Sequence, residues 1–238
     1  MAQYPLDPRR TTLLFFDMLN HYIYPHDAEK ARRIAATGVA ERSVAMARAA
    51  RAAGVQICHA VGSHRPDGGD HVPLITDGDM DLKPWPGGPR PMERPGATAG
   101  TREGEIIPEL APEPEDFVVP KYRWSAFAGT SLDLLLRWRG IDTILLAGGS
   151  TDVGIIATAY AARDLGYHLV ILRDACQTQR PGAQEFCMGG LFPRMGRVMT
   201  VEQAIALLTA GAARYRGRSS GGRPARSGRG RAEADRQG

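Results

Sequence analysis

The amino-acid sequence predicts an α/β fold in which helices surround a parallel β-sheet. Strand-length apolar runs alternate with helical patterns along the chain, which is the signature of βαβ units. Runs such as LLFF, ILLA and LVIL are apolar without alternation, as expected for parallel strands that are buried on both faces. The chain has 238 residues, of which 43% are hydrophobic, so it can form one good-sized core.

Six segments have the length and composition of strands. They cover residues 12–16, 55–61, 117–119, 143–147, 168–172 and 197–200. Helical spacing of apolar residues predicts helices between or after them, at residues 28–53, 130–139, 151–165 and 201–210. Gly54, Gly140 and Gly166 follow three of these helices, at the position where a C-terminal glycine is favoured.

Two segments depart from this alternation. Residues 63–112 are rich in Pro and Gly and leave the carboxyl end of a predicted strand, where ligands bind in open α/β sheets. We therefore expect a lid or a pocket wall. From Arg214 the chain is mainly Gly, Ser and Arg with little to bury, so we expect a folded domain over residues 1–212 and a disordered tail over 213–238.

Charge and cysteine content limit the possible partners and locations. The net charge is +4, but the tail alone carries eight Arg against two acids, which leaves the folded part slightly acidic. One aromatic residue, Tyr215, accompanies these arginines, and a basic tail with so few aromatic residues does not favour nucleic acid as a partner. No apolar run reaches the roughly 20 residues of a membrane span, and no secretory signal is found. Three widely spaced cysteines argue against a disulfide framework, and we expect a cytoplasmic protein.

Polar residues at strand ends mark the candidate site. Asp17 follows the first predicted strand, and Lys121 follows the third after Pro120. Gly148, Gly149 and Ser150 form a turn from the fourth strand into a helix, whose N–H groups can bind an anion or a developing oxyanion. Each feature also has a structural interpretation, namely a capping Asp, an exposed Lys and a simple chain reversal.

Taken together, these segments resemble the isochorismatase-like hydrolase family, also called cysteine hydrolases, from about Pro8 to Leu208. The resemblance rests on FFDMLN, on GTREGEIIPELAPEPEDFVVPKYRWSAFAGTSLDLLLRWRGIDTILLAGG and on STDVGIIATAYAARDLGY. It implies a three-layer α/β/α sandwich with a six-stranded parallel sheet, a homo-oligomer, and catalytic Asp and Lys residues at Asp17 and Lys121. It also implies a cis peptide at residues 149–150. We expect the small-molecule substrate to be bound by Gly149, Ser150, Trp124 and Asn20.

The family's nucleophilic cysteine is replaced here by Gly154. No thioester can form at this position, so the family's usual covalent amide hydrolysis is excluded there. Cys58 and Cys176 are interpreted as buried small residues and Cys187 lies in a segment without a prediction, which leaves a displaced nucleophile as a minor alternative. We also expect a Gly154→Cys variant to fold, because a helix start accepts a small side chain.

Glycine at this position is also what isochorismatases have, and these enzymes cleave a vinyl ether. The leading hypothesis is a cysteine-independent hydrolase of a carboxylated substrate, with Asp17 as general acid. Leu19 and Ser150 differ from the isochorismatase pattern, so isochorismate is one candidate among others. The remaining alternatives are a C–N hydrolase with a displaced nucleophile and a non-catalytic binding protein of the same fold.

No cofactor and no metal is expected. His64 and His71, with Asp70, resemble the metal-binding loop of nicotinamidases, but Gly62 stands where that pattern has an Asp, and two His make a weak site. Four arginines of the 63–112 segment are candidates to receive substrate carboxylates: Arg65, Arg90, Arg94 and Arg102.

Overall fold

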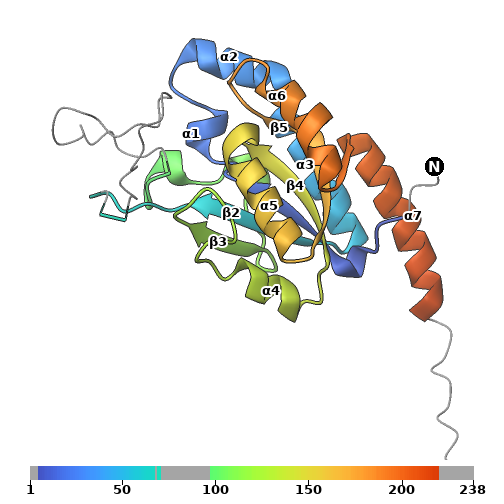
Figure 1. Ribbon diagram of the computed structural model, residues 1–238. Coiled ribbons are helices and arrows are strands. Elements are labelled where there is room, and N and C mark those ends of the chain that lie inside the picture. Colours follow the sequence, from blue (N-terminus) through green and yellow to red (C-terminus); the bar gives the residue numbers. More distant parts are fainter. Residues whose placement is uncertain (1–4, 68, 71–96, 220–238) are drawn as a thin grey trace, which may run out of the picture.

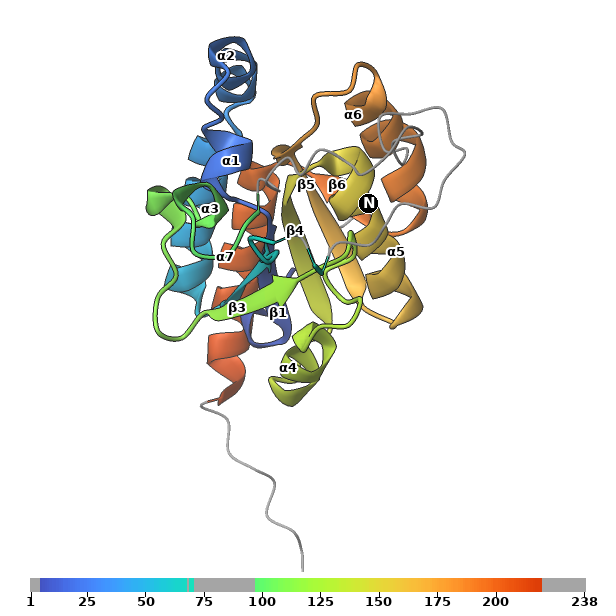
Figure 2. The ribbon, with the colours of Figure 1, turned by 90° about the vertical axis from the view of Figure 1, so that its left-hand side faces the viewer.

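A computed structural model describes residues 5–67, 69–70 and 97–219 and contains a six-stranded sheet. The strands are β1 (Thr11–Phe16), β2 (Gln56–Gly62), β3 (Phe117–Lys121), β4 (Thr143–Gly149), β5 (His168–Gln177) and β6 (Arg197–Met199). Their order is β3-β2-β1-β4-β5-β6, and every neighbouring pair is parallel. The predicted parallel sheet is confirmed (Figures 1 and 2).

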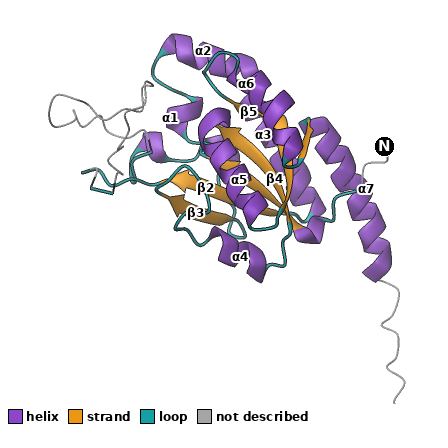
Figure 3. Cartoon of the chain, in the orientation of Figure 1, coloured by secondary structure: helices purple, strands orange, loops and turns teal. Residues whose placement is uncertain are grey.

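Helices cover both faces of this sheet, as Figure 3 shows. The helices are α1 (Asn20–Ile23), α2 (Ala28–Thr37), α3 (Val39–Ala53), α4 (Leu132–Trp138), α5 (Ile156–Asp164), α6 (Ala183–Glu185) and α7 (Val201–Ser219). Short 3-10 turns lie at Pro8–Arg10, Arg102–Gly104, Pro108–Leu110 and Phe192–Arg194, and π-helical turns at Thr151–Ile155 and Phe186–Leu191.

Two hydrophobic cores lie on opposite faces of the sheet because successive strand residues point to opposite sides. Leu13 and Phe15 of β1 belong to the core that includes residues of α3 and α7. Leu14 and Phe16 belong to the other core, which includes residues of α4 and α5. The result is the expected three-layer α/β/α sandwich.

Three helix predictions are corrected by the structure. The helix predicted at residues 28–53 is two helices, because Gly38 adopts a left-handed conformation with φ 65° and ends α2. The first turn of the helix predicted at 151–165 is π-helical. The helix predicted at 201–210 continues to Ser219.

The extension of α7 also corrects the predicted start of the tail. Ala212 is buried, Gly211 lies against the backbone of Leu6, and the guanidinium of Arg9 lies 5.3 Å from the centre of the Tyr215 ring. Ala and Arg are good helix formers, so this Ala/Arg-rich segment is helical where its polar composition predicted disorder. The remaining tail, 220–238, lies outside the described residues.

Boundaries elsewhere differ by a few residues. Strand β5 is five residues longer than the predicted 168–172 and ends at Gln177, so Cys176 lies within the strand instead of after it. Strand β3 includes Pro120 and Lys121, and Lys121 is therefore the last residue of an edge strand. Among the described residues, no helix combines the length and apolarity needed to cross a membrane.

Candidate active site

Asp17 lies where β1 ends and its backbone bends sharply. Its φ is 49°, a left-handed conformation that Asp and Asn tolerate better than most residues. Its N–H donates to the carbonyl oxygen of Ala60 at 2.9 Å, and its Oδ1 accepts from the N–H of Gly62 at 2.7 Å. These contacts with β2 hold the carboxyl group at the carboxyl-terminal edge of the sheet.

Lys121 reaches the same carboxyl group from the end of β3. Its Nζ donates to Asp17 Oδ2 at 2.7 Å, and the two residues are each 6% exposed. The same Nζ lies 4.1 Å from the centre of the Phe16 ring, a cation–π distance. The two predicted catalytic residues therefore form a buried ion pair that packs on an aromatic ring.

Burial raises the pKa of Asp17 above the usual Asp range. The ammonium of Lys121 and the Gly62 N–H oppose this by stabilising the carboxylate. Because burial is the larger effect, any group that draws Lys121 away from Asp17 would raise the pKa of Asp17 further.

The turn after β4 lies at the same edge of the sheet as Asp17 and Lys121. The Gly149-Ser150 peptide is cis, as expected. Ser150 Oγ donates to Asp152 Oδ1 at 2.6 Å, and Thr178 Oγ1 donates to the same oxygen at 2.6 Å. Arg180 Nε lies 3.4 Å from the other carboxylate oxygen of Asp152. Asp152 thus ties this turn to the segment that follows β5.

Gly154 lies in the π-helical turn and faces the Phe16 ring. A Cβ on residue 154 would lie 2.1 Å from Phe16 Cε1 and 2.3 Å from Phe16 Cζ, far inside van der Waals contact. Phe16 is buried in the core. The ring therefore occupies the space that a side chain at position 154 needs, which corrects the expectation that a cysteine is readily accommodated there.

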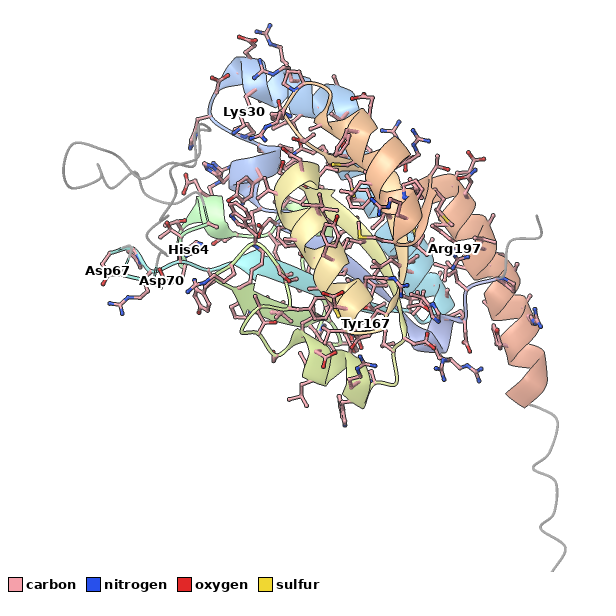
Figure 4. All side chains as sticks on the ribbon, viewed as in Figure 1. Lys30, His64, Asp67, Asp70, Tyr167 and Arg197 are labelled. Carbon is pink, nitrogen blue, oxygen red and sulfur yellow. The ribbon has the colours of Figure 1, made fainter. Side chains whose placement is uncertain are left out.

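A cavity of about 700 Å³ opens between these elements. Among the described residues it is lined by Phe16, Asp17, Tyr22, Lys30, Ile34, Gly62, His64, Ala97, Lys121, Tyr122, Arg123, Trp124, Gly149, Ser150, Val153, Gly154, Gln177 and Gln179. Figure 4 shows Lys30 on α2 and His64 just beyond β2. Asp17 and Lys121 thus converge on a cavity large enough for a small-molecule ligand.

The predicted substrate-binding residues fall into two groups. Gly149, Ser150 and Trp124 line the cavity. Asn20 does not, because its Nδ2 donates to the carbonyl oxygen of Arg102 at 2.8 Å and it borders a separate small pocket. This placement corrects the expectation that Asn20 contacts substrate.

The 63–112 segment contributes to the cavity through His64 and Ala97, which supports its interpretation as a pocket wall. Arg65 forms an exposed ion pair with Asp67, and Arg102 lies outside the cavity. His71, Arg90 and Arg94 lie outside the described residues. Within the described part of the chain, no three His, Cys, Asp or Glu side chains gather as a metal site.

The three cysteines lie away from the cavity. All are free and buried, and none contributes to the cavity lining. Burial raises the pKa of the Cys58 thiol to about 12, and it also raises the pKa values of Cys176 and Cys187. A buried thiol that resists ionisation is a poor nucleophile, so the described structure offers no support for a displaced cysteine.

Several lining residues were missed at the level of sequence. Tyr22, Lys30 and Arg123 come from helices and loops whose direction the sequence does not reveal. Gln177 was missed because β5 was predicted to end five residues earlier, at Leu172. With the correct strand end, its position would have indicated the same sheet edge as Asp17.

The fold and the cavity together define an α/β protein in which Asp17 and Lys121 meet at the carboxyl edge of a parallel sheet. Enzymes with open α/β sheets bind their small-molecule ligands at this edge. The model of the isochorismatase domain family matches residues 11–203. The chain therefore belongs to the isochorismatase family.

Similarity to individual proteins agrees with this assignment. The chain is 32% identical over 220 residues to the ureidoacrylate amidohydrolase RutB of Methylorubrum extorquens, covering 87% of this chain and 86% of that protein. It is 42% identical over 99 residues to the uncharacterized isochorismatase family protein YwoC of Bacillus subtilis, covering 42% of this chain.

The matched part spans only about half the length of YwoC, at 52%. Among solved structures, an isochorismatase family protein from Burkholderia thailandensis superposes with a TM-score of 0.70 and 28% identity, covering 87% of this chain and 100% of that one.

Proposed function

We propose that this protein is a cysteine-independent hydrolase that cleaves a vinyl ether in a small carboxylated substrate, with Asp17 as the general acid. The observation that carries the proposal is the packing of Phe16 against Gly154. The ring fills the place from which a nucleophile at position 154 would act, while the acid and its partner lysine line the cavity. The site thus keeps proton-transfer groups and lacks a nucleophilic thiol.

Charge in the cavity supports an anionic substrate. Three basic residues, Lys30, Lys121 and Arg123, line it, and Asp17 is the one acid among its described lining residues. Lys121 already neutralises Asp17, so the other two cations favour binding of a carboxylate.

The proposed reaction needs one proton transfer and one water. When the substrate carboxylate draws Lys121 away, the pKa of the buried Asp17 rises and the carboxyl group is protonated. Asp17 then transfers its proton to the terminal enol carbon, which leaves an oxocarbenium ion. Water adds to this ion and returns a proton to Asp17. The hemiketal then collapses to an alcohol and a 2-oxo acid, which completes hydrolysis with no change of oxidation state.

A second candidate, hydrolysis of a C–N bond, is favoured by the similarity to RutB over most of the chain. It requires either a nucleophile or a directly activated water. Since the three cysteines are buried outside the cavity, the vinyl-ether reaction accounts better for the residues present.

A product assay separates these candidates. The protein would be incubated with isochorismate, ureidoacrylate and nicotinamide, with pyruvate and ammonia measured in parallel. We expect pyruvate from the vinyl ether and no ammonia. Ammonia release would favour the C–N hydrolase, and absence of both products would exclude these three compounds as substrates.

The Asp17→Asn variant tests the assigned acid. Asn tolerates the left-handed backbone of residue 17, so the variant should fold while turnover falls about 10²- to 10⁴-fold. Asp164→Asn is a matched control, because Asp164 is exposed on α5. Full activity of Asp17→Asn would refute the assignment.

A further inference from the structure

Gln177 is a buried amide at the end of β5 that the proposed reaction does not use. It is 7% exposed, lines the cavity, and pairs in register with Gly149 of β4. A Cβ on Gly149 would lie 2.9 Å from Gln177 Nε2, so the amide lies directly on the Gly149-Ser150 turn. This amide is therefore placed to offer hydrogen bonds to a ligand in the cavity.

The orientation of this amide follows from its neighbours. Arg33 Nε donates to Gln179 Oε1 at 3.3 Å, and Arg carries donors only, so this atom of Gln179 must be the oxygen. Gln179 Nε2 is then the atom that donates to Gln177, at 3.0 Å, and it requires an oxygen there. Gln177 therefore turns its Nε2 group away from Gln179.

Gln177 Nε2 has no hydrogen bond to any described residue. Helix α2 places Arg33 on Gln179 and Lys30, three residues earlier, on the same cavity that Gln177 lines. A donor N–H group with nearby cations is suited to an anionic oxygen.

We propose that Gln177 Nε2 and Lys30 form a subsite for a substrate carboxylate, and that Gln179 and Arg33 position the Gln177 amide. The inference extends the proposed function by identifying a second anchoring point besides Lys121. Strands β1 and β5 are separated by β4, so the backbones of Asp17 and Gln177 lie about 10 Å apart at ~4.8 Å per strand. A substrate that reaches both has the size of a substituted ring.

Benzoate is a suitable probe because it is a ring-sized carboxylate without a hydrolysable bond. Its binding would be followed by the side-chain amide NMR signals of Gln177, assigned by their loss in Gln177→Met. We expect benzoate to shift these signals, and benzyl alcohol at the same concentration to leave them unmoved. Signals that do not respond to benzoate would overturn the proposal.

The Gln177→Glu variant is the sharper test. Glu keeps the oxygen that accepts from Gln179 and replaces the cavity-facing Nε2 by a second oxygen. Benzoate affinity, measured by calorimetry, should fall by about 10-fold or more in this variant. Gln203→Glu is the matched control, because Gln203 is exposed on α7 and its Oε1 accepts from Thr200 N–H. Equal affinity in the two variants would refute the subsite.

The positioning role has its own control pair. Arg33→Met should weaken benzoate binding, whereas Arg32→Met should not, since Arg32 Nε donates to the carbonyl oxygen of Ala28 instead of contacting Gln179. Benzoate binding requires no turnover and should persist in Asp17→Asn. Failure of vinyl-ether hydrolysis with an intact benzoate response would therefore refute the proposed reaction alone.

Discussion

Packing between Phe16 and Gly154 can be tested by a change of one methyl group. Gly154→Ala would place a Cβ 2.1 Å from Phe16 Cε1, so the ring would have to retreat by roughly 1.4 Å to reach a contact of about 3.5 Å. Because Phe16 is buried in the core and holds Lys121 Nζ on its face, this retreat should lower the free energy of unfolding by about 1–3 kcal/mol.

A matched glycine provides the control. Gly189 also lies in a π-helical turn, but a Cβ there would meet nothing within 4 Å. Gly189→Ala should therefore be neutral or stabilise the protein by up to about 1 kcal/mol, through reduced backbone entropy of the unfolded chain. The melting temperatures of the two variants should separate by ~2–4 °C for each kcal/mol of difference.

A double-mutant cycle then identifies the cause. Phe16→Leu removes Cε1 and Cζ, the two ring atoms nearest to residue 154. In this background the cost of Gly154→Ala should largely disappear, which gives a coupling of about 1–3 kcal/mol in urea unfolding. The cation–π contact of Lys121 is absent from both variants that carry Phe16→Leu, so its disturbance by the displaced ring is part of the measured coupling. Additive effects within ~0.5 kcal/mol would show that Phe16 does not occupy the space at residue 154.

Three further predictions concern the acid, the tail and the assembly. Burial raises the pKa of Asp17 and the reaction needs the protonated carboxyl group, so kcat/KM should fall as the pH rises through that pKa. The decrease of kcat should occur at a higher pH than the decrease of kcat/KM, because bound substrate draws Lys121 away from Asp17. Deleting residues 220–238 should leave the melting temperature and turnover unchanged, whereas truncation from Arg214 removes the end of α7 and should lower the melting temperature in calorimetry. Trp138 is 73% exposed on α4, and we expect a homo-oligomer that Trp138→Asp dissociates; a monomer mass for the unmodified protein in light scattering would contradict this.

The sequence alone determined the sheet and the edge of the sheet at which the candidate site lies. Apolar runs without alternation predicted the six parallel strands, and the positions of Asp17 and Lys121 at strand ends predicted that they meet. The absence of a thiol at residue 154 was also readable, since it depends only on residue identity.

Tertiary structure decided everything that depends on side-chain volume and direction. The sequence has Phe16 one residue before Asp17, but only the folded chain brings its ring against Gly154, 138 positions later. Asn20 is close to Asp17 in sequence, yet its amide donates to Arg102 instead of lining the cavity. Gln177 became visible only when β5 was seen to continue to that residue. Strand patterns report burial along the chain, whereas contacts between distant segments depend on packing that local periodicity does not encode.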